Sequence, residues 1–165
     1  VVGSSSSAEL SSVEQPSDYF MGSSMEQVKA GVKSIGKLNH VMELRIENGR
    51  RYNAFMREKG LWSYPDRILE NHSFLKYPVF VKDRALFMEK AEKAKVRLGD
   101  WFLSPIHPVL DNYAQWLLNI NDFPNAKFYS THILNLPTET TNCEKVLAFL
   151  NDNLDQLLPW EKKVN

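Results

Sequence analysis

Apolar residues recur at helical spacing over the first third of the chain. From Met25 to Ile46 they lie three or four positions apart, with lysine, glutamate and arginine between them, as in an amphipathic helix, and Tyr52 and Phe55 continue the pattern. The apolar positions are Met25, Val28, Val32, Ile35, Leu38, Met42, Ile46, Tyr52 and Phe55. Ser24 and Gln27 fit a capping box, and Gly60 is a suitable terminator. The pattern predicts a long helix over about 24–57.

Three glycines interrupt this helical pattern and lower its intrinsic stability by up to about 1 kcal/mol each relative to alanine. They are Gly31, Gly36 and Gly49. A glycine on a long helix permits close packing against a neighbour, and each of the three is also a point at which the helix can kink.

Short apolar runs alternate with helical patterns over the rest of the chain. The runs predict strands near 74–81, 98–104 and 132–136, and Pro78 favours an edge position for the first of them. Helices are predicted from Lys82–Asp83, from Phe123–Pro124 and, capped by Thr140 or Thr141, over about 141–156. Segments 62–71 and 109–122 are predicted to be, respectively, an irregular connection and a loop or short helical insert.

This alternation predicts an α/β domain rather than a bundle or a sandwich. We expect a small mixed sheet of about three strands, with the long N-terminal helix and the C-terminal helix packed against it. The serine-rich segment 1–16 has almost no large apolar residues, so we expect a disordered tail or linker there. The domain would then span 17–165.

Composition and charge exclude several classes of function. The 20 basic and 20 acidic side chains cancel, and there is no basic stripe of the kind that binds nucleic acid. No apolar run approaches the roughly 18 residues of a membrane span, and no signal-peptide pattern is apparent at the start. A single cysteine excludes an internal disulfide. We therefore expect a cytoplasmic protein that contacts neither nucleic acid nor membrane.

Three sequence blocks, in order, resemble the C-terminal small domain of the DegT/DnrJ/EryC1/StrS family. They are SSMEQVKAGVKSIGKLNHVMELRIENGRRYNAF, YPVFVKDR, and LGDWFLSPIHP with NLPT. Within the first block, the positions similar to the family pattern are Ser24, Gln27, Gly31, Leu38, Arg45, Arg50 and Tyr52. The resemblance implies the small domain of a fold-type I aminotransferase, an enzyme that uses pyridoxal phosphate (PLP) to transfer an amino group to nucleotide-linked keto-sugars.

The departures from the family pattern are as informative as the matches. Where the family carries Asn-x-Arg, whose side chains reach the cofactor phosphate and substrate of a neighbouring subunit, the alignment places Phe20 and Gly22. The family's cofactor lysine belongs to a large domain, and none of the thirteen lysines here lies in the expected serine-containing segment followed by glycine pairs. We therefore expect no PLP and no catalytic residue in this chain alone.

The substrate-side candidates are Trp101, Ser104 and His107, in the loop that the resemblance places toward the active site. Trp101 would stack on a base or a sugar, or else pack in a core or domain interface. His107 would hydrogen-bond the substrate, or else fix its proline-flanked loop. Ser104 precedes a proline outside any nucleophile elbow, so a serine–histidine catalytic pair is not expected.

Other polar residues give weaker signals. Arg45, Arg50 and Arg51 are consistent with phosphate recognition, but a solvated helix face is the simpler interpretation. Cys143 falls at a predicted helix start, where its thiol would be somewhat acidified. The remaining histidines lack metal-ligand spacing, so no metal site is expected. They are His40, His72 and His132.

Two functional hypotheses follow. In the first, the chain is the small domain of a sugar-nucleotide aminotransferase, as a fragment, a split half or a decayed stand-alone copy, and it supplies a substrate-side wall and subunit contacts. In the second, it is a non-enzymatic binding or assembly domain that retains the fold. We expect its partner to be either a separate large domain or a second copy held through helix 24–57, with weak sugar-nucleotide binding.

Overall fold

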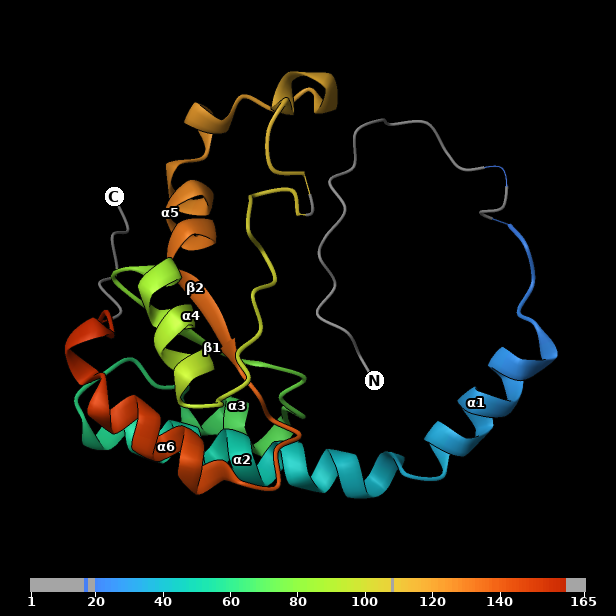
Figure 1. The fold of residues 1–165 in the computed structure, drawn as a ribbon, viewed down its shortest axis with the longest axis horizontal. Coiled ribbons are helices and arrows are strands. Elements are labelled where there is room, and N and C mark those ends of the chain that lie inside the picture. The colour runs from blue at the N-terminus through green and yellow to red at the C-terminus, as the bar shows by residue number, and fades with distance from the viewer. Residues whose placement is uncertain (1–16, 18–19, 108, 160–165) are drawn as a thin grey trace.

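The computed structural model describes residue 17, residues 20–107 and residues 109–159 (Figure 1). The predicted tail, 1–16, lies outside the described residues. The elements are α1 Met25–Ile35, α2 Leu38–Glu58, α3 Asp66–Asn71, β1 Tyr77–Phe80, α4 Arg84–Lys93, the 3-10 turns η1 Tyr113–Trp116 and η2 Ile120–Asp122, α5 Pro124–His132, β2 Ile133–Leu136, α6 Cys143–Asp152 and the 3-10 turn η3 Leu154–Gln156. This mixture of helices and strands agrees with the predicted α/β class.

The sheet in the described residues has two antiparallel strands. Tyr77 pairs with Leu136 at one end, and Phe80 pairs with Ile133 at the other. A mixed sheet of three strands was expected, and this expectation was wrong. Segment 98–104 contributes only an isolated bridge between Gly99 and Asn135. Phe102 has a φ of 68°, and this left-handed backbone cannot continue an extended strand.

The predicted long helix is two helices, α1 and α2, separated at Gly36 and Lys37. The capping box of Ser24 and Gln27 is present, and Gly60 follows the end of α2 with a φ of 67°. Lys37 N–H donates to Ser34 O instead of to the carbonyl four residues back, so the helical ladder tightens and stops there. Of the three glycines, Gly36 is therefore the one that marks the break.

Only the second of these helices packs against the sheet. Every residue of α1 is exposed, and the helix projects away from the rest of the described chain (Figure 1). The prediction that all of 24–57 packs on the sheet was therefore wrong for α1. In α2 the buried residues form one stripe, and they are Asn48, Gly49, Tyr52, Asn53 and Met56.

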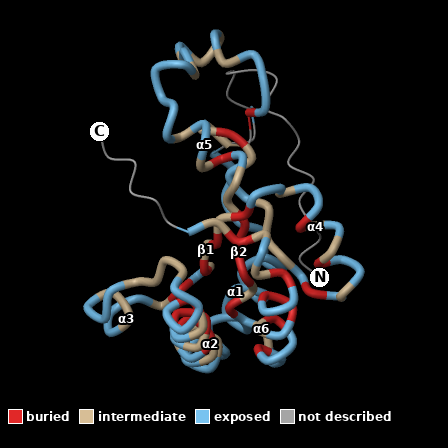
Figure 2. The backbone as a smooth tube through the Cα atoms, turned by 90° about the vertical axis from the view of Figure 1, so that its left-hand side faces the viewer, coloured by how far each residue is buried: buried red, intermediate tan, exposed pale blue. Residues whose placement is uncertain are grey.

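The core lies between the two strands, α2, α4 and α6, where buried residues concentrate (Figure 2). Its largest fully buried side chains include Tyr52, Tyr77, Phe74 and Phe87. Tyr52 O–H donates to Pro137 O at 2.8 Å, so the aromatic contact between α2 and the sheet also satisfies a polar group. The sheet is short, and its stability depends on these helices.

The shorter helices confirm some boundaries and correct others. Segment 62–71 was expected to be irregular, but it contains α3, which begins after Pro65. Asp83 caps α4 and Pro124 starts α5, as predicted. The cap of α6 is Asn142, rather than either threonine, because its side chain accepts from Lys145 N–H. This helix ends at Asp152, and the 3-10 turn η3 follows it.

No helix in the described ranges combines the length and the apolar character that crossing a bilayer requires.

Candidate functional site

The three candidate residues lie in an excursion of the chain between α4 and β2, which we call the outer lobe and define as residues 100–123. The chain enters it just after the bridge between Gly99 and Asn135. It then passes through the turns η1 and η2 and returns to the sheet along α5 (Figure 1). The predicted loop or short helical insert at 109–122 is confirmed. Nearly all described residues of this lobe are exposed or half-buried, and the buried ones are Ser104 and Val109 (Figure 2).

Trp101 stands at the start of the outer lobe, outside the core. Its side chain is 43% exposed, and Lys76 Nζ lies 5.7 Å from the ring centroid. That distance is within the range of a cation–π contact. Phe102 beside it is 53% exposed. The neck of the lobe therefore presents two aromatic side chains and one lysine to the surroundings.

Ser104 and His107 lie deeper in the same segment. Ser104 is 3% exposed and His107 is half-buried, and neither Ser104 Oγ nor His107 Nδ1 has a hydrogen-bond partner in the described structure. The ring of His107 makes an edge contact with Phe102, with centroids 6.2 Å apart. Because Ser104 and His107 do not bond to each other, they do not form a nucleophile–base pair.

A third polar atom of the lobe is also buried without a hydrogen-bond partner. Trp116 Nε1, in η1, is buried without a partner in the described residues. A buried polar atom without a partner costs about 1–3 kcal/mol, so native proteins carry few of them. Three buried polar atoms without a hydrogen-bond partner therefore lie in the described part of the outer lobe. No pattern in the sequence pointed to Trp116 or Lys76, because the burial of one and the ring contact of the other depend on tertiary structure.

The arginines proposed for phosphate recognition are engaged elsewhere. Arg45 pairs with Glu139, in the segment that leads into α6, and Arg51 pairs with Glu144, in the first turn of α6. Arg50 is exposed. The solvated-face interpretation therefore holds for Arg50, whereas Arg45 and Arg51 join structural elements.

The expected acidification of Cys143 was wrong. The residue begins α6, but it is only 3% exposed, and burial raises the pKa of its thiol. Among the described residues no group of histidine, cysteine and acidic side chains is arranged to hold a metal ion. His72 accepts from Phe74 N–H at 2.9 Å, and His132 contacts Val81 O at 2.8 Å. Both rings have structural partners.

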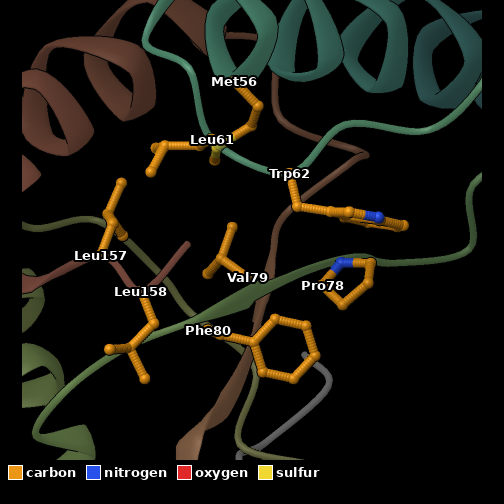
Figure 3. Close-up of a pocket in the computed structure, with 8 residues that line it drawn as sticks. All are labelled: Met56, Leu61, Trp62, Pro78, Val79, Phe80, Leu157 and Leu158. Atoms are coloured by element: carbon orange, nitrogen blue, oxygen red, sulfur yellow. The ribbon is translucent and has the colours of Figure 1, made fainter. Parts of the chain in front are cut away.

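A small apolar cavity lies away from the outer lobe, between the end of α2, β1 and the residues after η3 (Figure 3). Its lining is Met56, Leu61, Trp62, Pro78, Val79, Phe80, Leu157 and Leu158. The cavity volume is about 20 Å³, which is room for about one water molecule. It is a packing void and too small for a ligand.

Comparison with known proteins assigns the family. Residues 20–148 match the model of the DegT/DnrJ/EryC1/StrS aminotransferase family. Searches of curated proteins and of solved structures returned no match. The matched range runs from the exposed helix α1, through the sheet and the outer lobe, into α6, and it covers well over half of the 165 residues. The chain therefore belongs to the DegT/DnrJ/EryC1/StrS aminotransferase family.

Proposed function

We propose that this chain provides the substrate-side wall and the subunit contacts of a PLP-dependent aminotransferase that acts on nucleotide-linked keto-sugars. The observation that carries the proposal is the span of the family match, which includes both the exposed helix α1 and the outer lobe. Trp101 would stack on a base or a sugar ring. Ser104 and His107 would hydrogen-bond the polar groups of the ligand. A cytoplasmic location is part of the proposal, and the lack of a second cysteine favours it.

The described residues do not fit the cofactor itself. An internal aldimine needs an amine held in a desolvated site, because an exposed lysine with a pKa of about 10.4 is overwhelmingly protonated at neutral pH. None of the described lysines is buried. Phe20 is 86% exposed, and no side chain at Phe20 or Gly22 can bind a phosphate. We therefore assign no cofactor chemistry to this chain and place the lysine on the large domain of the enzyme.

This assignment predicts the behaviour of the purified 165-residue chain. It is expected to be colourless, to show no PLP absorbance after incubation with the cofactor and dialysis, and to transaminate no sugar nucleotide by itself. The measurements are absorbance spectra and an amino-transfer assay with glutamate as the donor. A specific lysine–PLP adduct that a single Lys→Ala change abolishes would contradict the assignment.

Binding of a sugar nucleotide to the face that contains Trp101 can be measured separately. Ligand-observed NMR with a uridine or thymidine diphosphate sugar should detect binding of millimolar strength, since the opposite wall belongs to the large domain. Trp101→Ala should reduce the signal severalfold because it removes the stacking surface, which contributes about 1–3 kcal/mol per base in aromatic stacking sites. Trp62→Phe, in the apolar cavity, is the control. Equal signals from both variants would contradict a ligand face at Trp101.

The exposed face of α1 is the proposed contact for the large domain. Its apolar side chains are Met25, Val28, Val32 and Ile35, with exposed fractions of 63, 47, 66 and 70%. Contiguous apolar surface of this kind marks an interaction site. In the absence of the large domain, the same face is expected to pair with a second copy of the chain.

Self-association of the chain should therefore depend on the apolar face of α1. We expect a homodimer or higher oligomer at tens of micromolar, and Val32→Glu should convert it to a monomer because each interface would bury an unpaired carboxylate. Ala30→Glu adds the same charge on the opposite side of α1 and should leave the assembly intact. Light scattering reports both. A monomeric parent chain, or equal effects of the two variants, would contradict this contact.

The non-enzymatic alternative is favoured by one specific observation. Phe20 and Gly22 occupy the positions where the family carries Asn-x-Arg, so the contacts with a neighbouring subunit's cofactor and substrate are absent. A binding or assembly domain would keep the fold and the α1 face without those two residues. Oligomerisation without any sugar-nucleotide binding would favour this alternative.

A further inference from the structure

Arg84, in the first turn of α4, lies at the neck of the outer lobe and contacts both limbs of the excursion. Its Nη2 donates to Asp100 O at 2.6 Å, and its Nη1 donates to Ser130 O at 2.7 Å. Asp100 directly precedes Trp101 on the outgoing limb. Ser130 lies in the last turn of α5 on the returning limb. One side chain thus connects two points that are thirty residues apart in the sequence.

The chemistry of arginine suits this position. The guanidinium group presents its N–H groups in a rigid planar fork, so it can hold two carbonyl oxygens in a fixed relation. Ser130 O is one of the last four carbonyls of α5, which lack partners within the helix and attract a cation. Arg84 is half-buried, and desolvation lowers its pKa while Asp100 opposes that shift. Hydrogen bonds from a charged donor to carbonyls compensate this partial loss of water.

A second connection lies beside the first. Gly99 and Asn135 exchange two backbone hydrogen bonds, of 2.8 and 2.9 Å, which hold the outgoing limb to β2. A Cβ atom on Gly99 would lie 3.3 Å from Asn135 Cβ, so the two backbones approach closely there. The bridge fixes residue 99, and Arg84 fixes residue 100. Trp101 is the next residue, and it is exposed.

We infer that Arg84 is the positioning residue of the substrate-side face. Its fork holds the two limbs of the outer lobe together and so sets the placement of the segment from Trp101 to His107. Arg84 acts through the carbonyls of Asp100 and Ser130. The inference rests on the proposed function only for the statement that this face contacts substrate. The pair of hydrogen bonds from Arg84, which we call the clamp, is a property of the isolated chain.

Amide hydrogen exchange on the purified chain tests the clamp without any ligand. Arg84→Met should raise the exchange rates of hydrogen-bonded amides in the lobe, such as Val109 and Leu118, and of segment 128–132 at least tenfold, while the rates in β1 and β2 stay within twofold of the parent chain. Arg84→Lys keeps the charge but loses the fork, so its rates should be intermediate. Arg67→Met, which removes an exposed arginine from α3, should change none of these segments.

Unchanged exchange in the lobe of Arg84→Met, or a uniform increase over lobe and sheet alike, would overturn the inference. If Arg84→Met does not fold, the test is made with Arg84→Lys. Exchange rates in the lobe of Arg84→Lys equal to those of the parent chain would show that the guanidinium fork is unnecessary. A sugar-nucleotide titration of the parent chain separates the two proposals. Its failure would remove the proposed ligand, whereas the exchange result alone decides the role of Arg84.

Discussion

Asn53→Ala should lower the free energy of unfolding by about 3 kcal/mol, because it removes three hydrogen bonds, one from the buried Tyr77 hydroxyl and two with the half-buried backbone of Tyr64. Asn53 is 1% exposed. Its Nδ2 donates to Tyr64 O at 3.1 Å, and its Oδ1 accepts from Tyr64 N–H at 2.6 Å and from Tyr77 O–H at 3.0 Å. Burial raises the pKa of Tyr77, so its hydroxyl keeps its proton and remains a donor. One amide thus joins α2 to β1 and to the segment after α2.

Urea denaturation followed by circular dichroism measures this effect. Asn151→Ala is the matched control, because Asn151 lies exposed in α6 and its loss should change the free energy of unfolding by less than about 0.5 kcal/mol. Asn53→Asp should also be strongly destabilising, since a carboxylate cannot donate to Tyr64 O. A loss below 1 kcal/mol for Asn53→Ala would show that water satisfies the three groups.

Gly49→Ala should be destabilising even though alanine has the higher helix propensity. A Cβ atom at Gly49 would lie 2.5 and 2.6 Å from ring atoms of Phe74 and 3.1 Å from its Cβ. Phe74 cannot move aside easily, because it is fully buried and its ring packs against Tyr64 and Tyr77. Overpacking of this kind costs about 1–3 kcal/mol, more than the roughly 1 kcal/mol gained in propensity. Because two of the distances fall below 3.0 Å and Phe74 is buried, the cost lies at the upper end of this range, and we expect a net loss of about 2 kcal/mol.

Gly31→Ala is the matched control for this change. Gly31 lies in α1, and a Cβ atom there would have no neighbour within 4 Å. The substitution should therefore raise helicity without any loss of stability. Thermal denaturation of the two variants compares them directly. If Gly49→Ala were as stable as the parent chain, α2 would not approach Phe74 as closely as the structure indicates.

Local sequence signals predicted the elements that depend on local chemistry. The capping box at Ser24 and Gln27, the aspartate cap of α4 and the proline that starts α5 are all present. Each depends on groups within four residues of one another, so the local sequence is sufficient to predict it. The two paired strands were also predicted, because their apolar runs fill the core.

The predictions that were wrong concern features that depend on residues distant in the sequence. The run at 98–104 resembles a strand in composition, but only Gly99 finds a partner on β2, and the backbone turns left-handed at Phe102. The apolar face of α1 has the periodicity of a packed helix, yet nothing in the described residues covers it. Periodicity shows which face is apolar, and it does not show what lies opposite.

For the candidate site, the sequence selected the segment and the structure supplied the arrangement. The LGDWFLSPIHP block directed attention to Trp101, Ser104 and His107. It could not indicate that Lys76 lies over the ring of Trp101, or that Arg84 connects the two limbs, because those contacts span 25 residues in the first case and 16 and 46 in the second. Contacts of this range exist only once the chain has folded.

The sequence by itself determined the family, the caps of α1 and α4, the proline that starts α5 and the two paired strands. Only the tertiary structure decided that α1 extends free of the sheet, that the sheet has two strands in the described residues, and that Arg84 holds the outer lobe. The physical reason is that capping and propensity act within one turn of chain, whereas burial, strand pairing and side-chain clamps depend on which distant groups come together.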